Sequence, residues 1–271
     1  MTFTIRSTFV VLAAAVGLLA ASPSARAVEV YNSNGFESPR FIPGDLAGQD
    51  ILGPWLKDSG TGTAVVQSAV TNGGSQAVRL NRPADDNGDV RYGVRKELVP
   101  TGSLQIVRVS WDMNVTQTNI EGVDFGPYFG VESYDSFNDD IKLIGSLGLD
   151  ATTGDILYQD GLDGFLVETG AKAPFGQWNR YMLEINYQTD EYSVFYNGAK
   201  LATTTFVDPG IVGFTDAPLA GLDATGFTFD IASGTAYFDN YTIEIVPEPS
   251  ALALVGLGSL ALLRRRRTGA R

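Results

Sequence analysis

The stretch from Trp178 to Phe206 constrains the fold of this chain more than any other part of the sequence. Its apolar residues recur with a period of two, as in strands that bury one face. The chain reverses at Gln188–Glu191, and again at Asn197-Gly198, which is the preferred residue pair for a type I′ hairpin turn. We therefore predict three consecutive antiparallel strands.

The same period recurs through residues 28–246, in short runs separated by Gly, Asn, Asp and Pro, and no segment keeps a helical period. No linker or internal repeat divides this body, which favours a single domain. Eight or more strands in such a domain predict an all-β fold, a two-sheet antiparallel sandwich of jelly-roll type. The further strands that we expect are Ala64–Val70, Ala77–Leu80, Gln105–Val115, Tyr128–Glu132, Ile141–Leu149, Asp155–Gln159 and Thr235–Val246.

Residues 1–27 have the pattern of a secretory signal. Arg6 precedes the apolar segment Phe9–Ala21, and the small residues Ala25 and Ala27 then flank a cleavage site. We expect a signal helix that signal peptidase removes, so that the mature chain begins at Val28.

Residues 247–271 have the pattern of a second targeting segment, at the C-terminus. An apolar run from Ala251 to Leu263 is shorter than the roughly 20 residues that span a bilayer comfortably, so we expect a short apolar helix that anchors the chain transiently. Arginines are costly to move across a membrane, so those after the run stay in the cytoplasm. The motif before the run and the cluster after it are Pro247, Glu248 and Pro249, and Arg264, Arg265, Arg266 and Arg267.

The order of these three parts resembles the PEP-CTERM sorting tail of Gram-negative bacteria, which the membrane transpeptidase exosortase recognises. The resemblance implies export, transient anchoring in the inner membrane, and cleavage near Pro247-Glu248-Pro249. It also implies delivery to the cell surface or to the extracellular polysaccharide matrix. An ordinary C-terminal tail anchor is the alternative.

The chain contains no cysteine and no histidine. These absences exclude disulfides, Ser-His-Asp and Cys-His catalysis, and ordinary zinc sites. The net charge is −12, and the body is more acidic still because seven arginines lie in the two ends. Such a surface repels nucleic acid, and any metal would be a hard cation held by oxygens, Ca²⁺ first.

Four motifs in the body, taken in order, resemble the concanavalin A-like lectin/glucanase superfamily, including laminin G-like modules. The family implies a two-sheet jelly roll, often with glycan binding on the concave sheet, sometimes glycosidase activity and often a bound Ca²⁺. The motifs are Gly35-Phe36-Glu37, Gly74-Ser75-Gln76-Ala77-Val78, the Tyr-rich hairpin that runs from Trp178 to Asn197-Gly198, and Tyr237-Phe238-Asp239-Asn240.

Whether the chain has the catalytic motif of the family's glycosidases can be read from the sequence. Retaining β-glucanases of this fold carry Glu-x-Asp-x-x-Glu on one face of a strand, because acid and nucleophile must lie about 5 Å apart. The string is absent here. The nearest pairs, Glu121 with Asp124 and Glu132 with Asp135, have the wrong spacing and put their carboxylates on opposite strand faces. We therefore expect no enzymatic activity.

The resemblance also implies a structural Ca²⁺ site at Glu37 and Asp239, because related jelly rolls place the first and last strands side by side with acids that share the ion with backbone carbonyls. Asp239 is expected to share the inward face of Tyr241, Ile243 and Ile245, where an unpaired carboxylate is costly to bury. The alternative is a carboxylate satisfied by backbone amides or an arginine. The other acid-rich segments, Asp85–Asp89, Asp135–Asp140 and Asp150–Asp155, are predicted to be turns.

The leading hypothesis is an exported, non-catalytic, lectin-like surface or matrix protein that binds a glycan or another matrix component. The alternatives are a purely structural, Ca²⁺-stabilised surface protein and, with less support, a glycoside hydrolase. The sequence assigns no ligand-binding residue. Trp111 and Trp178 are predicted to lie in the core, whereas four aromatic residues near strand ends are candidates for stacking on sugars: Trp55, Tyr128, Tyr134 and Tyr158.

Overall fold

The computed structural model describes residues 27–51, 53–85, 88–98, 105–118, 126–137, 140–223 and 232–247. Within these ranges Val28–Ile245 forms one compact unit that holds both sheets and the core, so we take this body to fold without the two ends. The predicted signal helix and the predicted apolar helix of the tail lie outside the described residues. Among the residues that are described, no helix is long and apolar enough to cross a membrane.

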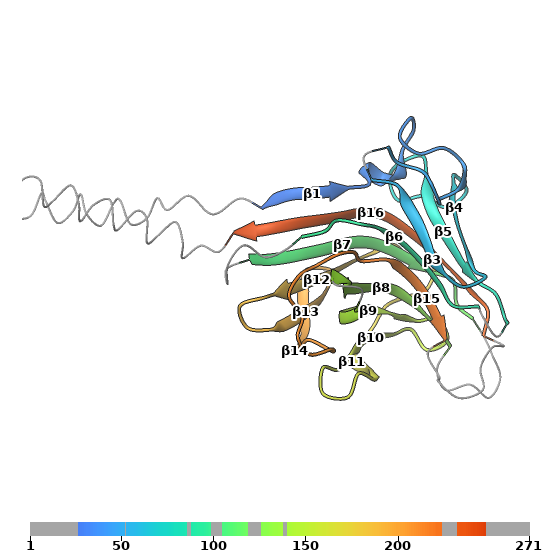
Figure 1. Ribbon diagram of the computed structural model, residues 1–271. Helices are drawn as coiled ribbons and strands as arrows, with labels where there is room; N and C mark the ends of the chain where they lie inside the picture. The colour runs from blue at the N-terminus through green and yellow to red at the C-terminus, as the bar shows by residue number, and fades with distance from the viewer. Residues whose placement is uncertain are drawn as a thin grey trace, which may run out of the picture. The chain divides into compact units, whose positions relative to one another are not determined.

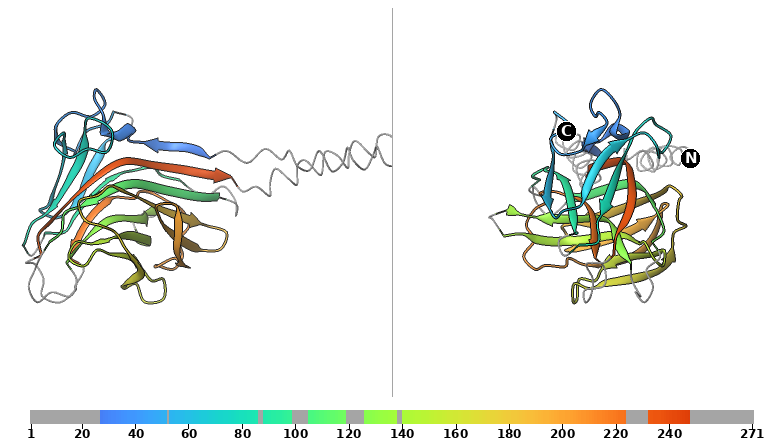
Figure 2. Two further views of the ribbon diagram at one scale, coloured as in Figure 1. Left: turned by 180° about the vertical axis from the view of Figure 1, so that it is seen from behind. Right: turned by 90° about the vertical axis from the view of Figure 1, so that its right-hand side faces the viewer.

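The body is an all-β sandwich of two antiparallel sheets, as predicted (Figure 1; Figure 2). Sheet A runs in the order β14 (Ala199–Thr205), β13 (Glu191–Tyr196), β12 (Asn179–Asn186), β7 (Gln105–Val115), β16 (Gly234–Pro247), β5 (Ala77–Arg82), β4 (Thr63–Gln67) and β2 (Gly44–Asp45), and β1 (Val28–Asn32) also pairs with β16. Sheet B runs in the order β11 (Leu166–Lys172), β10 (Asp155–Gln159), β9 (Lys142–Asp150), β8 (Pro127–Asp135), β15 (Leu219–Asp223), β6 (Val90–Val94) and β3 (Trp55–Ser59).

The three consecutive strands predicted between Trp178 and Phe206 are β12, β13 and β14, and they pair in sequence order. Asn197 and Gly198 both have positive φ, at 47° and 81°, as a type I′ turn requires. The prediction for this stretch is confirmed.

Alternating side chains from both sheets meet in one hydrophobic core. Trp111 lies there with no exposed surface and stacks on Tyr181 at 5.9 Å between ring centroids. The matching prediction for Trp178 is wrong, because this residue precedes the first residue of β12 and stays half-buried. Trp55 is also fully buried, and its Nε1 donates a hydrogen bond to Tyr31 Oη at 2.8 Å.

The last strand, β16, changes its partner part-way along its length. It pairs with β5 as far as Phe238 opposite Val78, and with β1 from Thr242 onward (Figure 1). Between them Asn240 has φ of +48°. Phe238 and Tyr241, three residues apart, are both fully buried in the core, so a bulge at Asn240 resets the alternation of the strand.

This bulge overturns one prediction. Asp239 does not share the inward face of Tyr241, Ile243 and Ile245, because the extra residue shifts its side chain toward the edge where β5 gives way to β1. Asp239 is nevertheless only 1% exposed. Its surroundings are therefore loops at a strand edge.

Candidate functional site

Glu37 and Asp239 come together in the gap where β16 leaves β5. Glu37 follows the 3-10 turn η1 (Asn34–Phe36), in which all three residues have positive φ. A Cβ atom placed on Gly35 would lie 3.4 Å from Asp239 Oδ1 and 3.5 Å from Glu37 Cγ. The two predicted ligands thus flank one glycine.

Glu37 is held by the loop between β4 and β5. Its Oε1 accepts the backbone amides of Ser75 at 2.6 Å and Gln76 at 3.0 Å, and its Oε2 accepts the Ser75 hydroxyl. Burial raises the pKa of Glu37, but the three hydrogen bonds lower it by more, so the net pKa lies below its ordinary value. A Cβ on Gly74 would overlap Glu37 Oε1, so the loop needs glycine there to approach this closely.

Asp239 has the opposite balance. Burial raises the pKa of its carboxyl to about 7, the amides of Asn240 and Asn72 oppose this, and the charges of Asp112 and Glu37 add to it. Asp239 Oδ1 accepts the Asn240 amide at 2.7 Å, and Oδ2 accepts the Asn72 amide at 3.2 Å. These two hydrogen bonds satisfy the carboxylate but do not neutralise its charge.

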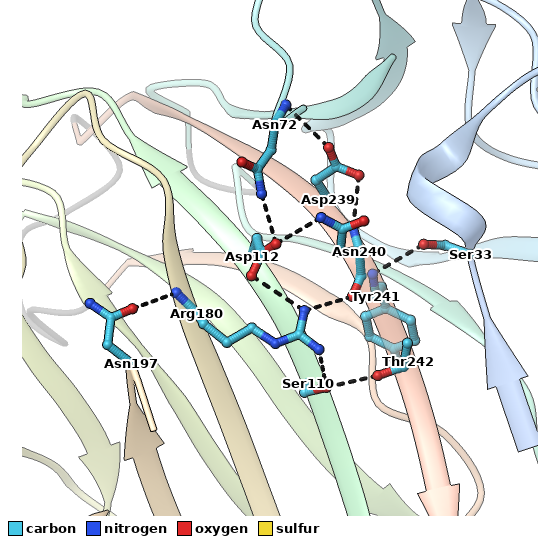
Figure 3. A network of polar contacts seen from close by, with 10 residues as sticks. All are labelled: Ser33, Asn72, Ser110, Asp112, Arg180, Asn197, Asp239, Asn240, Tyr241 and Thr242. Carbon is cyan, nitrogen blue, oxygen red and sulfur yellow. Dashed lines mark hydrogen bonds and ion pairs between the residues drawn. The ribbon is translucent and has the colours of Figure 1, made fainter. Parts of the chain in front are cut away.

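A network of polar contacts continues from this gap across the outer face of sheet A (Figure 3). Asp112 on β7 accepts hydrogen bonds from the side-chain amides of Asn72 and Asn240, both at 2.7 Å. Arg180 on β12 forms an ion pair with Asp112 at 3.3 Å and donates to Ser110 Oγ at 2.6 Å. The network therefore joins β7, β12, β16 and the loop between β4 and β5.

The oxygens around Gly35 fit a hard divalent cation. Asp239 Oδ1 and Asn240 Oδ1 lie 3.4 and 3.6 Å from the Cβ position of Gly35, and Glu37 Oε1 lies beside Gly74. Carboxylate and amide oxygens of this kind are ligands that Ca²⁺ prefers. A carboxylate oxygen with one hydrogen bond keeps another lone pair for a metal. Among the described residues no three Asp, Glu, His or Cys side chains gather at one point, so backbone carbonyls would supply the remaining ligands.

Among the other acidic segments, Asp150–Asp155 forms the predicted turn, whereas residues 86–87 of Asp85–Asp89 and residues 138–139 of Asp135–Asp140 lie outside the described residues. Asp150 Oδ1 accepts the amide of Thr152 at 2.6 Å. Asp135 Oδ2 accepts the amide of Val212 at 2.7 Å, and Asp85 opens a turn closed by a backbone hydrogen bond of 3.0 Å. Each of these acids is tied to nearby backbone or to other side chains.

A separate cluster of charged side chains lines a pocket of about 390 Å³ on the outer face of sheet B. Strand β6 contributes Arg91, and Arg95 follows the last residue of this strand. Arg91 points outward because its neighbours Val90 and Tyr92 are buried in the core. Other strands contribute Asp58 from β3, Tyr134 from β8, and Asp216 and Pro218 from the segment before β15.

Two carboxylates face each other across Gly93. A Cβ on this glycine would lie 3.2 Å from Asp58 Oδ2 and 3.6 Å from Asp216 Oδ2. The Thr215 hydroxyl donates to Asp216 Oδ1 at 2.8 Å, but neither Asp58 nor Asp216 Oδ2 has a hydrogen-bond partner among the described residues. Both acids are therefore free to accept hydrogen bonds from a ligand.

Burial is the main cause of the shifted pKa values of the two acids in this pocket. It raises the pKa of Asp216 to about 6, the Thr215 hydroxyl opposes this, and the charge of Asp58 adds to it. Burial also raises the pKa of Asp58, which Arg95 and then Arg91 partly lower. At neutral pH the pocket thus presents two carboxylates beside two guanidinium groups.

Arg91, which lines this pocket, pairs with the buried Glu132. Arg91 Nε donates to Glu132 Oε2 at 2.5 Å and Nη2 donates to Oε1 at 3.4 Å, and the Glu132 side chain is only 4% exposed. Burial raises the pKa of Tyr134, Glu132 adds to this, and Arg91 opposes it. Glu132 faces outward and Asp135 inward, as predicted, while Glu121 and Asp124 lie outside the described residues.

Sequence reasoning missed this pocket, since its residues come from four distant segments. One signal was present: Arg91, Gly93 and Arg95 alternate with apolar residues, so charged groups had to share one face. Of the aromatic candidates for sugar stacking, only Tyr134 lines the pocket. Trp55 and Tyr128 are fully buried, and Tyr158 packs partly buried against the core.

The end of the chain, residues 246–267, matches the PEP-CTERM protein-sorting motif. The chain carries a PEP-CTERM sorting signal. The match confirms the resemblance based on Pro247-Glu248-Pro249 and the arginine cluster, and it indicates an exported protein that is anchored at the membrane and processed by exosortase. Pro247 ends β16, whereas the rest of the PEP-CTERM motif lies outside the described residues, as does Ala25 of the signal cleavage site.

The body is similar in fold to solved structures of low sequence identity. An endo-1,3-beta-glucanase from Streptomyces sioyaensis has a TM-score of 0.56 and 11% identity, with 83% of this chain and 99% of that chain covered. An endo-beta-1,4-glucuronan lyase from the fungus Trichoderma reesei has a TM-score of 0.51 and 12% identity, with coverages of 80% and 95%. A sialidase has a TM-score of 0.52 and 10% identity, with 70% of this chain covered, and the chain spans only 16% of it.

These similarities show the fold, a two-sheet antiparallel sandwich of jelly-roll type, which confirms the fold class expected from the sequence. Among curated proteins, none matches the chain.

Proposed function

We propose that the protein is delivered to the cell surface or extracellular matrix of a Gram-negative bacterium, where its jelly roll binds a glycan or another matrix component without catalysing a reaction. The sorting signal supports the route through the inner membrane. The pocket on sheet B supports the binding role. Ca²⁺ held by Glu37 and Asp239 would stabilise the body.

The arrangement around Gly93 carries the proposal. The absence of a side chain on Gly93 lets the Asp58 and Asp216 carboxylates approach the strand and each other, and the exposed Arg95 lines the same pocket as both acids. Carboxylates accept hydrogen bonds and guanidinium groups donate them. A sugar hydroxyl does both, so this surface can hold a glycan in a defined orientation.

A glycan array of neutral and acidic polysaccharides, probed with Val28–Ile245 with and without chelator, tests this role. We expect Gly93→Ala and Arg95→Ala to weaken binding at least about tenfold, a loss of about 1.4 kcal/mol. Lys200→Ala on β14 of sheet A is the matched control and should bind normally. Binding that survives both pocket substitutions would contradict the proposed site. A wild-type body that retains no glycan but is stabilised by Ca²⁺ would support the purely structural alternative.

The sorting route has its own test. In a host with exosortase, the full-length protein should lose the segment after about Pro249, whereas a host without the enzyme should retain the protein in the inner membrane. Mass spectrometry of the C-terminal peptide decides between them. Surface protein that still carries Arg264–Arg271 would contradict processing.

The same acid pair favours a second candidate function, glycoside hydrolysis. Asp216 has a raised pKa beside Asp58, and glycosidases use paired carboxylates of which the general acid has a raised pKa. We expect no release of reducing sugar from β-glucans, agarose or carrageenan, because the glucanase triplet is absent. Turnover above about 0.01 per second that disappears in Asp216→Asn would instead establish an enzyme, since most enzymes run at about 1 to 1000 per second.

A further inference from the structure

A second pocket, of about 460 Å³, lies at one end of sheet A, where β4 and β16 begin and β5 and β7 end. The strand register pairs Thr63 with Asn81 and Asn81 with Thr235. The Thr116 amide donates to the Thr235 carbonyl at 3.0 Å. A row of uncharged polar residues therefore crosses four neighbouring strands.

The row faces away from the core. Ala64 and Leu80, the strand neighbours of Thr63 and Asn81, are fully buried, so the polar side chains between them point to the other face of the sheet. Gln117 and Thr118 extend the row beyond the end of β7. The lining is open to solvent and belongs to the opposite sheet from the charged pocket at Arg91.

The lining differs from the rest of the surface in charge. It includes no carboxylate, on a chain with 31 acidic residues. Arg82 beneath it is 2% exposed and is paired within the protein, with Asp89 at 3.3 Å and Asp223 at 3.8 Å. Its Nη1 also donates to the Pro83 carbonyl at 3.2 Å. A ligand in this groove thus meets hydroxyl and amide groups and no net charge.

Several of these groups are available to a ligand. The side chains of Thr63, Gln117 and Thr118 have no hydrogen-bond partner among the described residues. Asn81 Oδ1 accepts the Thr235 hydroxyl at 2.8 Å, which fixes the amide and leaves its Nδ2 as a donor. Such groups match the hydroxyls of a neutral sugar.

The groove is also preformed. A Cβ on Gly62 would lie 2.6 Å from the Asn81 carbonyl oxygen, and a Cβ on Gly234 would lie 2.7 Å from Phe129 Cε2. The backbone under the lining therefore sits directly on packed neighbours, with no side chain between. Rigid sites lose little entropy when they bind.

We propose that this row is a second binding site, which takes an uncharged glycan strand lying across β4, β5, β16 and β7. Adjacent strands lie about 4.8 Å apart, comparable to the length of one sugar residue, so successive sugars can contact successive strands. Because the charged pocket is on sheet B, one body can then bridge two glycan chains. The bridging role rests on the proposed function of sheet B, whereas the neutral site does not.

Binding of neutral oligosaccharides by Val28–Ile245 tests the site, with cello-, laminari-, manno- and xylohexaose as probes. The variant Thr63→Val with Thr118→Val keeps side-chain shape and breaks no hydrogen bond among the described residues, and we expect it to bind at least about tenfold more weakly. The matched control, Thr205→Val, changes an exposed threonine on β14 of the same sheet and should bind like wild type. Arg95→Ala should also keep neutral binding.

The outcomes separate the two sites. Failure of the wild type to bind any neutral probe at millimolar concentration overturns the second site, as does unchanged binding by the double valine variant. Loss of neutral binding in Arg95→Ala would mean that sheet B is the only glycan site. If Arg95→Ala no longer binds acidic or charged ligands but still binds neutral oligosaccharides, the result supports two separate sites. Wild type should then aggregate a mixture of the two polysaccharides, and either variant should fail to do so.

Discussion

Among the described residues, two carboxylate pairs each flank a glycine, and the two pairs differ in the hydrogen bonds that they accept. Glu37 and Asp239 meet at Gly35, and every carboxylate oxygen accepts a hydrogen bond from the protein. Asp58 and Asp216 meet at Gly93, and among the described residues only one of their oxygens accepts a hydrogen bond.

The difference lies in what surrounds each glycine. At the first pair, loops replace a missing strand partner of β16 and bring backbone amides to the acids. At the second, the acids stand on the outer face of a continuous sheet, where backbone groups are already used in strand pairing. Glu37 and Asp239 at the strand edge therefore bind to the protein's own backbone, whereas Asp58 and Asp216 on the sheet face remain available to a ligand.

The largest expected effect is on the melting temperature, and it tests whether Arg91 in the sheet B pocket stabilises the fold. Arg91→Ala leaves the buried Glu132 without its bidentate partner, and such a loss costs about 3 to 5 kcal/mol. At about 2 to 4 °C per kcal/mol, the melting temperature should fall by roughly 10 °C. Adding Glu132→Gln should recover part of the loss. A melting temperature that does not move would mean that the pair contributes no stability.

The next effect concerns the pair at Gly35. Ca²⁺ at 100 times its dissociation constant should stabilise the body by about 2.7 kcal/mol, which raises the melting temperature by roughly 5 to 10 °C. Asp239→Asn should abolish the Ca²⁺-specific part, while Asp58→Asn should keep it. Mg²⁺ controls for diffuse screening of the acidic surface, because it rejects flexible carbonyl-rich sites. Equal responses to both ions in wild type and Asp239→Asn would exclude the site.

The pH dependence of stability, measured in the presence of a chelator, distinguishes Asp239 from Asp216. The pKa of Asp239 is raised to about 7 in the folded state, so folding retains a proton that the unfolded chain releases near pH 4. Stability should therefore fall as pH rises from about 4 to about 7, and Asp216 should add to the fall up to about pH 6. Asp239→Asn should remove the decline above pH 6 in thermal melts. A profile identical to that of wild type would contradict the raised pKa.

The smallest effect on stability is expected for Arg95→Ala. Its side chain is exposed at the pocket rim, and surface substitutions usually stay within about 0.5 kcal/mol. The melting temperature should move by less than about 2 °C, although glycan binding weakens. A larger destabilisation would show that this arginine, like Arg91, holds the sheet together.

The sequence predicted the fold where alternation was clean. Gln105–Val115 and Asp155–Gln159 have the predicted boundaries, and the three strands from Trp178 to Phe206 pair as expected. It missed β3 and β11, which are the two edges of sheet B and carry many exposed or charged residues. It also missed β6 and β15, whose glycines weaken the apolar pattern.

The sites show a similar division. The meeting of Glu37 and Asp239 was predicted from a resemblance, but the orientation of Asp239 was not, because the bulge at Asn240 depends on β16 changing partners. The pocket at Gly93 needs β3, β6, β8 and β15 to be neighbours. That order is a property of the assembled sheet, and no local pattern specifies it.

The position of β16 also determines how the body bears a mechanical load. The strand runs to Pro247, within the matched sorting motif, and lies between β7 on one side and β5 or β1 on the other. A pull along β16 would load the hydrogen bonds on both of its flanks in shear, so these bonds would have to break together. A tail attached to an edge strand would instead unzip one bond at a time. The strand that leads into the sorting motif is therefore an interior strand of sheet A and not an edge strand.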